Sequence, residues 1–271
     1  MHLDFGSKVL VMGILNVTPD SFSDGGRFFD ADNIAKHVAA MVQAGSDIID
    51  VGGESTRPFA EPVSIADECG RILPAIRLIR QVSAIPISID TTKAEVARKA
   101  LAEGADIIND ISALRFDPEM LSLVRETEVP VVIMHMQGTP SDMQVDPHYD
   151  DVVSEIKDFF EERLAWAEEN GVSRNRFIID PGIGFGKTVG HNLSILKRVA
   201  EFADLGCPVL VGHSRKSFIG KLLGAELHAR DVATAAISAL CAQQGVSVLR
   251  VHDVEKTVQA VRLAEAIKLA D

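Results

Sequence analysis

Two aspartates and an asparagine at the ends of short apolar runs are the side chains best suited to bind a polar ligand. Asp90 closes the run ISID, Asn109 lies near the end of DIIND, and Asp180 closes RFIID. Each has a local alternative, because aspartate is common in turns and at helix starts. If they share one crevice, two carboxylates and an amide suit a ligand with adjacent N–H donors, such as an amino-pyrimidinone edge.

Cationic side chains gather in the segment GHSRKSFIG. Arg215 and Lys216 are expected in the first turn of a helix, with Ser214 or Ser217 as its cap. Cations there oppose the helix dipole, at a cost of about 0.3–1 kcal/mol each. The pair is either a solvated surface feature or part of a site for an anionic or carbonyl-bearing ligand.

Arg250 and His252 stand two residues apart on the last apolar run, so their side chains point to the same face. A buried cation is costly without a partner. Either acidic neighbours neutralise Arg250 or a bound anion does, and a purely structural ion pair remains open.

The glycine-rich segment DPGIGFGKT resembles a phosphate-binding loop only in part. A Walker A sequence requires glycine where Pro181 stands, and a GxGxxG motif requires glycine where Lys187 stands. The segment is therefore either a flexible turn or a mobile wall that holds Asp180 at its base and presents Phe185 to a ligand.

The elements that position these residues are eight short, nearly continuous apolar runs separated by segments with helical spacing. Continuous runs are typical of strands buried on both faces of a parallel sheet. Five helices are expected to end at glycines before the next run. The pattern predicts an α/β fold, a single TIM barrel over residues 1–271, with the site at the carboxyl ends of the strands. A doubly wound open sheet is the alternative. The five glycines are Gly45, Gly104, Gly171, Gly206 and Gly245.

Composition excludes several classes of protein. With 27 basic and 39 acidic residues, the net charge of −12 argues against a nucleic-acid partner. No apolar stretch reaches the roughly 18 residues of a membrane span, so neither a membrane partner nor secretion is expected. Cys69, Cys207 and Cys241 lie far apart without a CxxC, which favours packing roles and a cytoplasmic location.

Seven segments together resemble one family, the bacterial dihydropteroate synthases. They occur in the family's order and at about its spacing, from near the start of the chain to its last strand. The segments are NVTPDSFSDGG, DVGGESTRP, SIDTTK, INDIS, DPGIGFGK, GHSRKSFIG and RVHDV. The resemblance implies an enzyme of folate synthesis, inhibited by sulfonamides. It would join 6-hydroxymethyl-7,8-dihydropterin pyrophosphate to 4-aminobenzoate, giving 7,8-dihydropteroate and pyrophosphate.

The resemblance also implies roles for individual residues. The pterin site would comprise Asp90, Asn109, Met134, Asp180 and Lys216. The pyrophosphate site would comprise Asn16, Arg250 and His252, with Mg²⁺ near Asn16. The 4-aminobenzoate pocket would comprise Thr56, Arg57, Pro58, Phe185 and Ser217. Lys216, Arg250 and His252 would be catalytic, and Arg250 and His252 would supply positive charge to the leaving pyrophosphate.

A homodimer is expected from the family alone, with Ala235, Ala236, Ile237, Ala239 and Leu240 on helices apolar enough to contribute. One position departs from the family: Phe59 follows STRP where glycine is usual. We expect it to alter the affinity for sulfonamides relative to 4-aminobenzoate. The alternatives are a methyltetrahydrofolate methyltransferase and a non-catalytic pterin-binding module.

Overall fold

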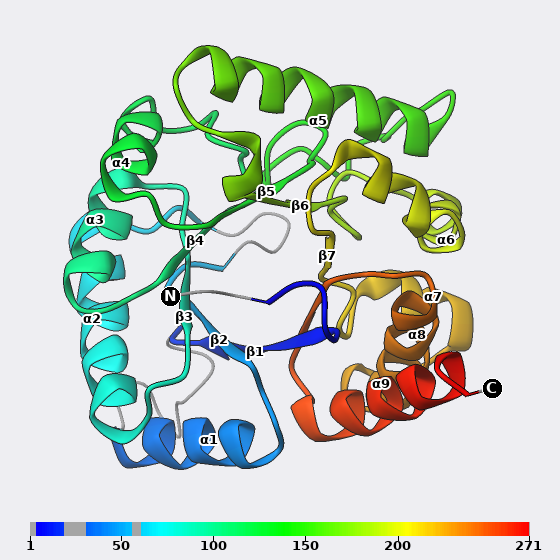
Figure 1. Ribbon diagram of the computed structural model, residues 1–271, viewed down its shortest axis with the longest axis horizontal. Helices are drawn as coiled ribbons and strands as arrows, with labels where there is room; N and C mark the ends of the chain where they lie inside the picture. The colour runs from blue at the N-terminus through cyan, green and yellow to red at the C-terminus, as the bar shows by residue number, and fades with distance from the viewer. Residues whose placement is uncertain (1–3, 19–30, 56–60, 271) are drawn as a thin grey trace.

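A computed structural model describes residues 4–18, 31–55 and 61–270. Strands and helices alternate along these ranges (Figure 1). The strands are β1 (Leu10–Asn16), β2 (Ile48–Gly52), β3 (Ile87–Asp90), β4 (Ile107–Asp110), β5 (Val131–Met134), β6 (Phe177–Asp180), β7 (Leu210–Val211) and β8 (Val248–Val251). The α-helices are α1 (Ala31–Gln43), α2 (Ile65–Val82), α3 (Ala94–Ala102), α4 (Glu119–Thr127), α5 (Val152–Glu169), α6 (Val189–Lys197), α7 (Ser217–Leu223), α8 (Asp231–Gln243) and α9 (Val254–Lys268). Short 3-10 helices cover Arg174–Arg176, Val199–Leu205 and Leu227–Arg230.

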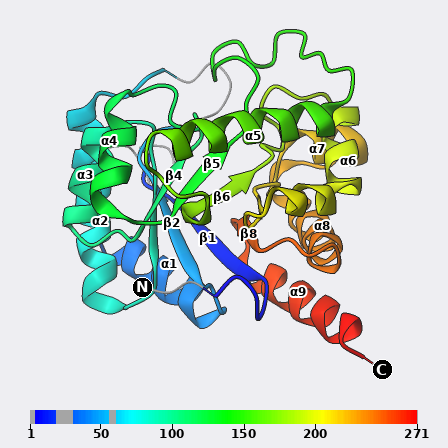
Figure 2. The same cartoon turned by 45° about the horizontal axis from the view of Figure 1, so that its top comes forward.

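The strands form a nearly closed parallel barrel. Their order is β6-β5-β4-β3-β2-β1-β8-β7, and every named pair is parallel. A bridge between Ile179 and Val209 joins β6 to the segment before β7, where the Ile179 N–H donates to the Pro208 carbonyl at 3.0 Å. The helices surround the strands in both views (Figures 1 and 2). The TIM-barrel prediction is confirmed, and the open-sheet alternative is wrong.

Alternate residues of the strands face two environments. One set, including Ile49, Ile89 and Ile133, packs outward with helix residues in the large core. The other set points into the barrel and forms two layers. The first is apolar and is here called the barrel floor: Leu10, Met12, Ile48, Ile107, Val132, Ile178, Leu210 and Val248. The second lies nearer the carboxyl ends of the strands and is here called the polar layer: Asp50, Asp90, Asn109, Asp180 and Arg250. On β2, β4, β6 and β8 the polar residue follows a floor residue by two positions, which keeps it on the same face.

Helix boundaries follow local sequence signals. The five glycines predicted to end helices all have positive φ, between 72° and 107°. Asp151 caps α5 and Asp253 caps α9 through side-chain bonds to the first-turn backbone. The three cysteines are buried and unpaired, as predicted. Among the described residues, no helix has the length and apolar character that a membrane crossing requires.

Candidate active site

Arg250 spans the interior of the barrel. Its Nε donates to Asp50 Oδ2 at 2.6 Å, and its Nη2 donates to Asp90 Oδ2 at 2.6 Å. Because β1 and β2 separate β8 from β3 in the sheet, the contact with Asp90 crosses the interior. Asn109 Nδ2 lies 3.2 and 3.3 Å from the two oxygens of Asp50. Acidic neighbours therefore neutralise Arg250, which was one of the two alternatives from sequence.

Asp180 lies at the end of β6, with one oxygen already bonded. Its Oδ1 accepts the Gly182 N–H at 2.8 Å, which fixes the carboxylate at the base of the glycine-rich loop. The neighbour of Asp180 Oδ2 is Gly212, which has no side chain, and a Cβ placed on it would lie 3.5 Å from that oxygen. Asp180 thus retains an oxygen that can accept hydrogen bonds from a ligand.

Burial shifts the protonation of this layer. It raises the pKa of Asp90, against the opposing charge of Arg250, and it raises the pKa of Asp180. Burial, with Arg250 nearby, lowers the pKa of Lys216 to about 8, although Asp180 and Asp90 oppose that shift. Asp90 and Asp180 are therefore weaker acids, and Lys216 is a weaker base, than the same groups in water.

Lys216 and Phe185 form the boundary between the polar layer and a small apolar cluster. Lys216 Nζ lies 3.9 Å from the centre of the Phe185 ring, a cation–π contact. Phe185 packs in a cluster with Ile111, Met134, Met136 and Met143. Predicted pterin and 4-aminobenzoate residues therefore adjoin each other. Ser217 is exposed as the first residue of α7.

His252 is held by the loop that follows β7. Its backbone N–H donates to Ser214 Oγ at 3.1 Å, and its Nδ1 lies 2.9 Å from the same oxygen. The Ser214 hydroxyl can donate to Nδ1, an arrangement that assigns the ring proton to Nε2. Burial and the cations Arg215, Arg250 and Lys216 lower the pKa of His252 to about 3. The ring is therefore neutral before an anion binds, and its role at the leaving pyrophosphate stays a prediction.

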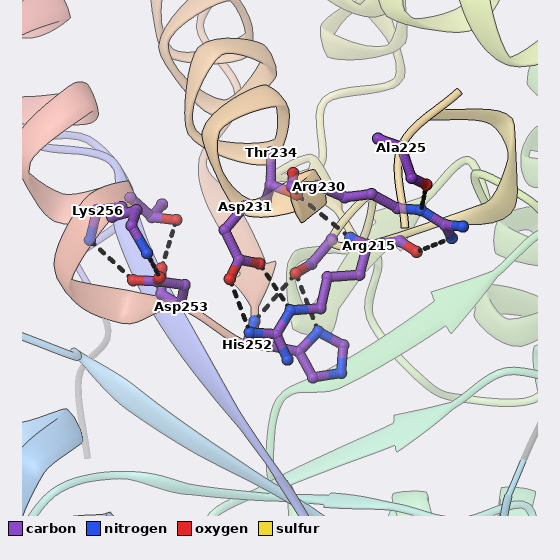
Figure 3. Close-up of polar contacts among 10 residues, drawn as sticks. Arg215, Ala225, Arg230, Asp231, Thr234, His252, Asp253 and Lys256 are labelled. Carbon is purple, nitrogen blue, oxygen red and sulfur yellow. Dashed lines mark hydrogen bonds and ion pairs between the residues drawn. The ribbon is translucent and has the colours of Figure 1, made fainter. Parts of the chain in front are cut away.

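The structure also corrects the start of the helix after β7. The helix α7 begins at Ser217, Lys216 is the preceding cap residue without a side-chain cap bond, and Arg215 has a φ of 56°. Arg215 Nε and Nη2 donate to Asp231 at 2.6 and 2.9 Å (Figure 3). Neither Ser214 nor Ser217 caps the helix, since Ser214 Oγ contacts His252 Nδ1 and Ser217 is already the first helical residue. Arg215 therefore fixes the segment that carries Ser214 and Lys216.

Asn16, at the end of β1, lies at the same rim as Asp90. The Asn16 amide oxygen and the Asp90 carboxylate are both within 3.7 Å of the point where a Cβ on Gly52 would stand. The remaining predicted residues of the 4-aminobenzoate pocket, and the family departure at position 59, lie outside the described residues. These are Thr56, Arg57, Pro58 and Phe59.

Sequence reasoning missed Asp50 and the contacts of Lys187. Asp50 is fully buried and contacts both Arg250 and Asn109. A charged residue inside an apolar run, two positions after Ile48, was an available signal. Lys187 is buried against His135 and Phe185, and no spacing rule brings position 135 to position 187.

Comparison with known proteins agrees over nearly the whole chain. Residues 12–252 match the family model described as pterin binding enzyme. The dihydropteroate synthase of Escherichia coli (strain K12) is 48% identical over 256 residues, 94% of this chain and 90% of that protein.

Two solved structures are also similar. Yersinia pestis dihydropteroate synthase with a sulfonamide drug complex has a TM-score of 0.93 at 42% identity, covering 99% of this chain and 97% of that chain. Xanthomonas albilineans dihydropteroate synthase with 4-aminobenzoic acid has a TM-score of 0.91 at 45% identity, covering 98% and 95%. The chain belongs to the pterin-binding enzyme family and, within it, to the dihydropteroate synthases.

Proposed function

We propose that the protein condenses 6-hydroxymethyl-7,8-dihydropterin pyrophosphate with 4-aminobenzoate, releasing 7,8-dihydropteroate and pyrophosphate. The observation that carries this function is the polar layer, where carboxylates and an amide face the same interior as Arg250 and Lys216. The similar Xanthomonas protein was solved with 4-aminobenzoic acid, and the Yersinia protein with a sulfonamide drug. Membership of the family supports the same second substrate and inhibitor class here.

Asp180 and Asn109 are the groups best placed to bind the pterin edge. An ionised carboxylate that accepts two adjacent N–H groups forms charge-assisted bonds, which are stronger than neutral ones. Asp180 keeps an oxygen for this purpose, and Asn109 offers both a donor and an acceptor. Asp90 contributes when Arg250 turns from it toward the pyrophosphate while keeping its bond to Asp50. Lys216 would then donate to the carbonyl side of the ring.

Catalysis rests on stabilising the leaving group. The bond between the exocyclic pterin carbon and the pyrophosphate oxygen breaks, and its electron pair departs with pyrophosphate. The reduced pterin delocalises the cation, and the amine nitrogen of 4-aminobenzoate forms the new bond and releases its proton to water. Arg250, turned toward the pyrophosphate, supplies positive charge where negative charge develops. His252 donates a hydrogen bond from Nε2, because its pKa near 3 leaves it neutral before the anion arrives.

We propose Mg²⁺ as the metal. Within the described parts of the chain, no group of three or more His, Cys, Asp or Glu side chains could hold an ion by itself. Asn16 offers one hard oxygen ligand, which fits an ion bound mainly through phosphate oxygens and water. When bound, Mg²⁺ would add positive charge at the leaving pyrophosphate.

The 4-aminobenzoate pocket is proposed to adjoin Phe185 and Ser217. The ring of Phe185 and the ammonium of Lys216 offer an apolar wall and a positive charge to an aromatic carboxylate. Thr56, Arg57 and Pro58 complete this proposed pocket.

We propose a homodimer and a cytoplasmic location. An exposed apolar stripe on α8 comprises Val232, Ala236 and Leu240, spaced four residues apart. Val232 is 73% exposed and Leu240 64% exposed, so the stripe is available to contact a second copy of the chain, which membership of the family supports. Sedimentation of the wild type beside Val232→Glu would test the dimer, and a monomeric wild type would contradict it.

The function is tested by measuring pyrophosphate and dihydropteroate in one reaction with Mg²⁺, with and without 4-aminobenzoate. The proposal predicts equal amounts of both products and dependence of dihydropteroate on the arylamine. Tight pterin binding without either product would contradict the proposal and favour a methyltransferase or a binding module.

A further inference from the structure

Lys187 is a buried cation that the proposed mechanism does not use. It is 4% exposed, and its Nζ lies 2.8 Å from the Phe185 carbonyl oxygen and 3.0 Å from His135 Nδ1. The His135 carbonyl oxygen lies 3.3 Å from the same nitrogen. None of the ion pairs within residues 4–18, 31–55 and 61–270 includes Lys187. Its contacts are therefore a ring nitrogen and backbone carbonyls.

These contacts satisfy the ammonium group. In its protonated form Lys187 has three N–H donors, which meet these three acceptors without a carboxylate. Burial and the charge of Lys187 hold the pKa of His135 well below its usual value, so Nδ1 keeps the lone pair that accepts. Burial lowers the pKa of Lys187 itself to about 7, against the charge of Asp180. The bonds thus tie the end of the glycine-rich loop to the end of β5.

The loop that carries Phe185 is held on both sides of that residue. Gln144 Nε2 donates to the Gly184 carbonyl at 2.7 Å, and Tyr149 Oη donates to the Gly186 carbonyl at 2.8 Å. Both donors belong to the connection between β5 and α5, which projects at the top of Figure 2. Lys187 adds the bond to the carbonyl of Phe185 itself.

The loop also packs too closely against β5 to shift freely. A Cβ on Gly182 would stand 1.9 Å from the His135 carbonyl oxygen, the oxygen that Lys187 also contacts. The Phe185 backbone is held by several hydrogen bonds: its N–H donates to the Gly182 carbonyl at 3.0 Å, and its carbonyl accepts from Lys187 Nζ at 2.8 Å. The Phe185 ring in turn lies 3.9 Å from Lys216 Nζ.

We propose that Lys187 is a positioning residue that sets the affinity for the arylamine substrate by fixing Phe185. The inference rests on the proposed function, in which Phe185 borders the 4-aminobenzoate pocket. The pterin substrate is bound mainly by Asp180 and Asn109, so its affinity depends little on Lys187.

The test is steady-state kinetics of Lys187→Met with each substrate varied in turn. Methionine keeps much of the side-chain length and removes all three donors. We expect KM for 4-aminobenzoate to rise about tenfold, because small displacements of binding groups are costly. KM for the pterin substrate should stay within about twofold. Equal rises in both KM values, or no rise in a folded variant, would overturn the proposal.

Arg176→Met is the matched control, because Arg176 directly precedes β6, whereas Lys187 lies in the loop that follows it. Arg176 donates to the Val129 carbonyl from Nε at 3.1 Å and from Nη2 at 2.5 Å, so this variant also removes a cation bonded to backbone. It should change stability without separating the two KM values. A separation like that of Lys187→Met would show that loss of stability alone produces the effect and would overturn the proposal.

Two further variants keep the proposal testable if Lys187→Met folds poorly. Tyr149→Phe removes only the bond to Gly186 and should raise KM for 4-aminobenzoate about twofold to threefold. Lys187→Met in a Phe185→Leu background should add little, because its effect passes through Phe185. Additive effects would contradict that route. A wild type that makes no dihydropteroate would instead defeat the proposed function.

Discussion

The barrel floor and the polar layer lie on the same strands, but the first stabilises the fold and the second is suited to bind a ligand. Ile48, Ile107, Ile178 and Val248 fill the interior with apolar side chains, each at most 1% exposed. Two residues further along, the same strands present Asp50, Asn109, Asp180 and Arg250. The first layer stabilises the fold by removing apolar surface from water, and the second places costly polar groups where a ligand can use them.

The difference shows how this barrel separates stability from chemistry. Residues two positions apart on a strand point to the same face, so each strand places one apolar and one polar side chain in the interior with regular backbone. The polar layer is stable because its charges neutralise one another, with Arg250 between Asp50 and Asp90. Variants in the two layers should therefore fail in different ways.

The largest effect is expected for Arg250→Met. Loss of the charge that stabilises the leaving group should lower kcat/KM about 10³-fold, measured by pyrophosphate release. It should also destabilise the fold, because Asp50 is left buried without its cation. Adding Asp50→Asn should recover stability in thermal unfolding without recovering activity. Recovery of both would mean that Arg250 is only a structural partner.

A floor variant should show the reverse pattern. Ile107→Ala removes a fully buried side chain and should lower the free energy of unfolding by about 2–5 kcal/mol. At a temperature where the variant is folded, both KM values should match the wild type. Denaturant unfolding and steady-state kinetics measure the two quantities. A large rise in either KM would show that the layers are not independent.

Lys216 should make activity and stability move oppositely with pH. Its pKa is lowered from 10.5 to about 8 in the fold, so the folded state binds fewer protons than the unfolded state between these values. Its contribution to the unfolding free energy therefore rises with pH from about 8 to about 10.5. Activity should fall as pH rises through about 8, because the ammonium charge is lost.

The comparison is made between wild type and Lys216→Met at each pH, which cancels the other titrating groups. The difference in unfolding free energy should change across this pH range. A constant difference would exclude a lowered pKa for Lys216.

The smallest effect is expected for Ser214→Ala. The variant removes the hydroxyl that contacts His252 Nδ1 at 2.9 Å, so the ring loses the bond that sets its proton on Nε2. We expect kcat to fall about fivefold, the effect of one modest hydrogen bond. Ser154→Ala, on α5 with its hydroxyl bonded to Asp151, is the control. An unchanged kcat would indicate that the hydrogen bond from His252 does not stabilise the leaving pyrophosphate.

The fold was predictable because strands buried on both faces have continuous apolar sequences, and all eight runs became strands. The polar ends of those runs also predicted most of the polar layer. Asp50 was missed because it lies inside a run and its partner Arg250 is 200 residues away. The predicted start of α7 was wrong, since Arg215 lies before the helix and pairs with Asp231, the first residue of α8. Such contacts depend on how the barrel closes, which no local pattern contains.

The most direct measurement is the Kd of 6-hydroxymethyl-7,8-dihydropterin pyrophosphate for Asp180→Asn beside Ile107→Ala and the wild type. Asparagine keeps the shape and can still accept the Gly182 N–H, but it loses the charge. We predict about 10- to 100-fold weaker binding for Asp180→Asn, from the loss of charge-assisted bonds, and unchanged binding for Ile107→Ala. Wild-type affinity in Asp180→Asn would contradict the assignment of the polar layer as the pterin site.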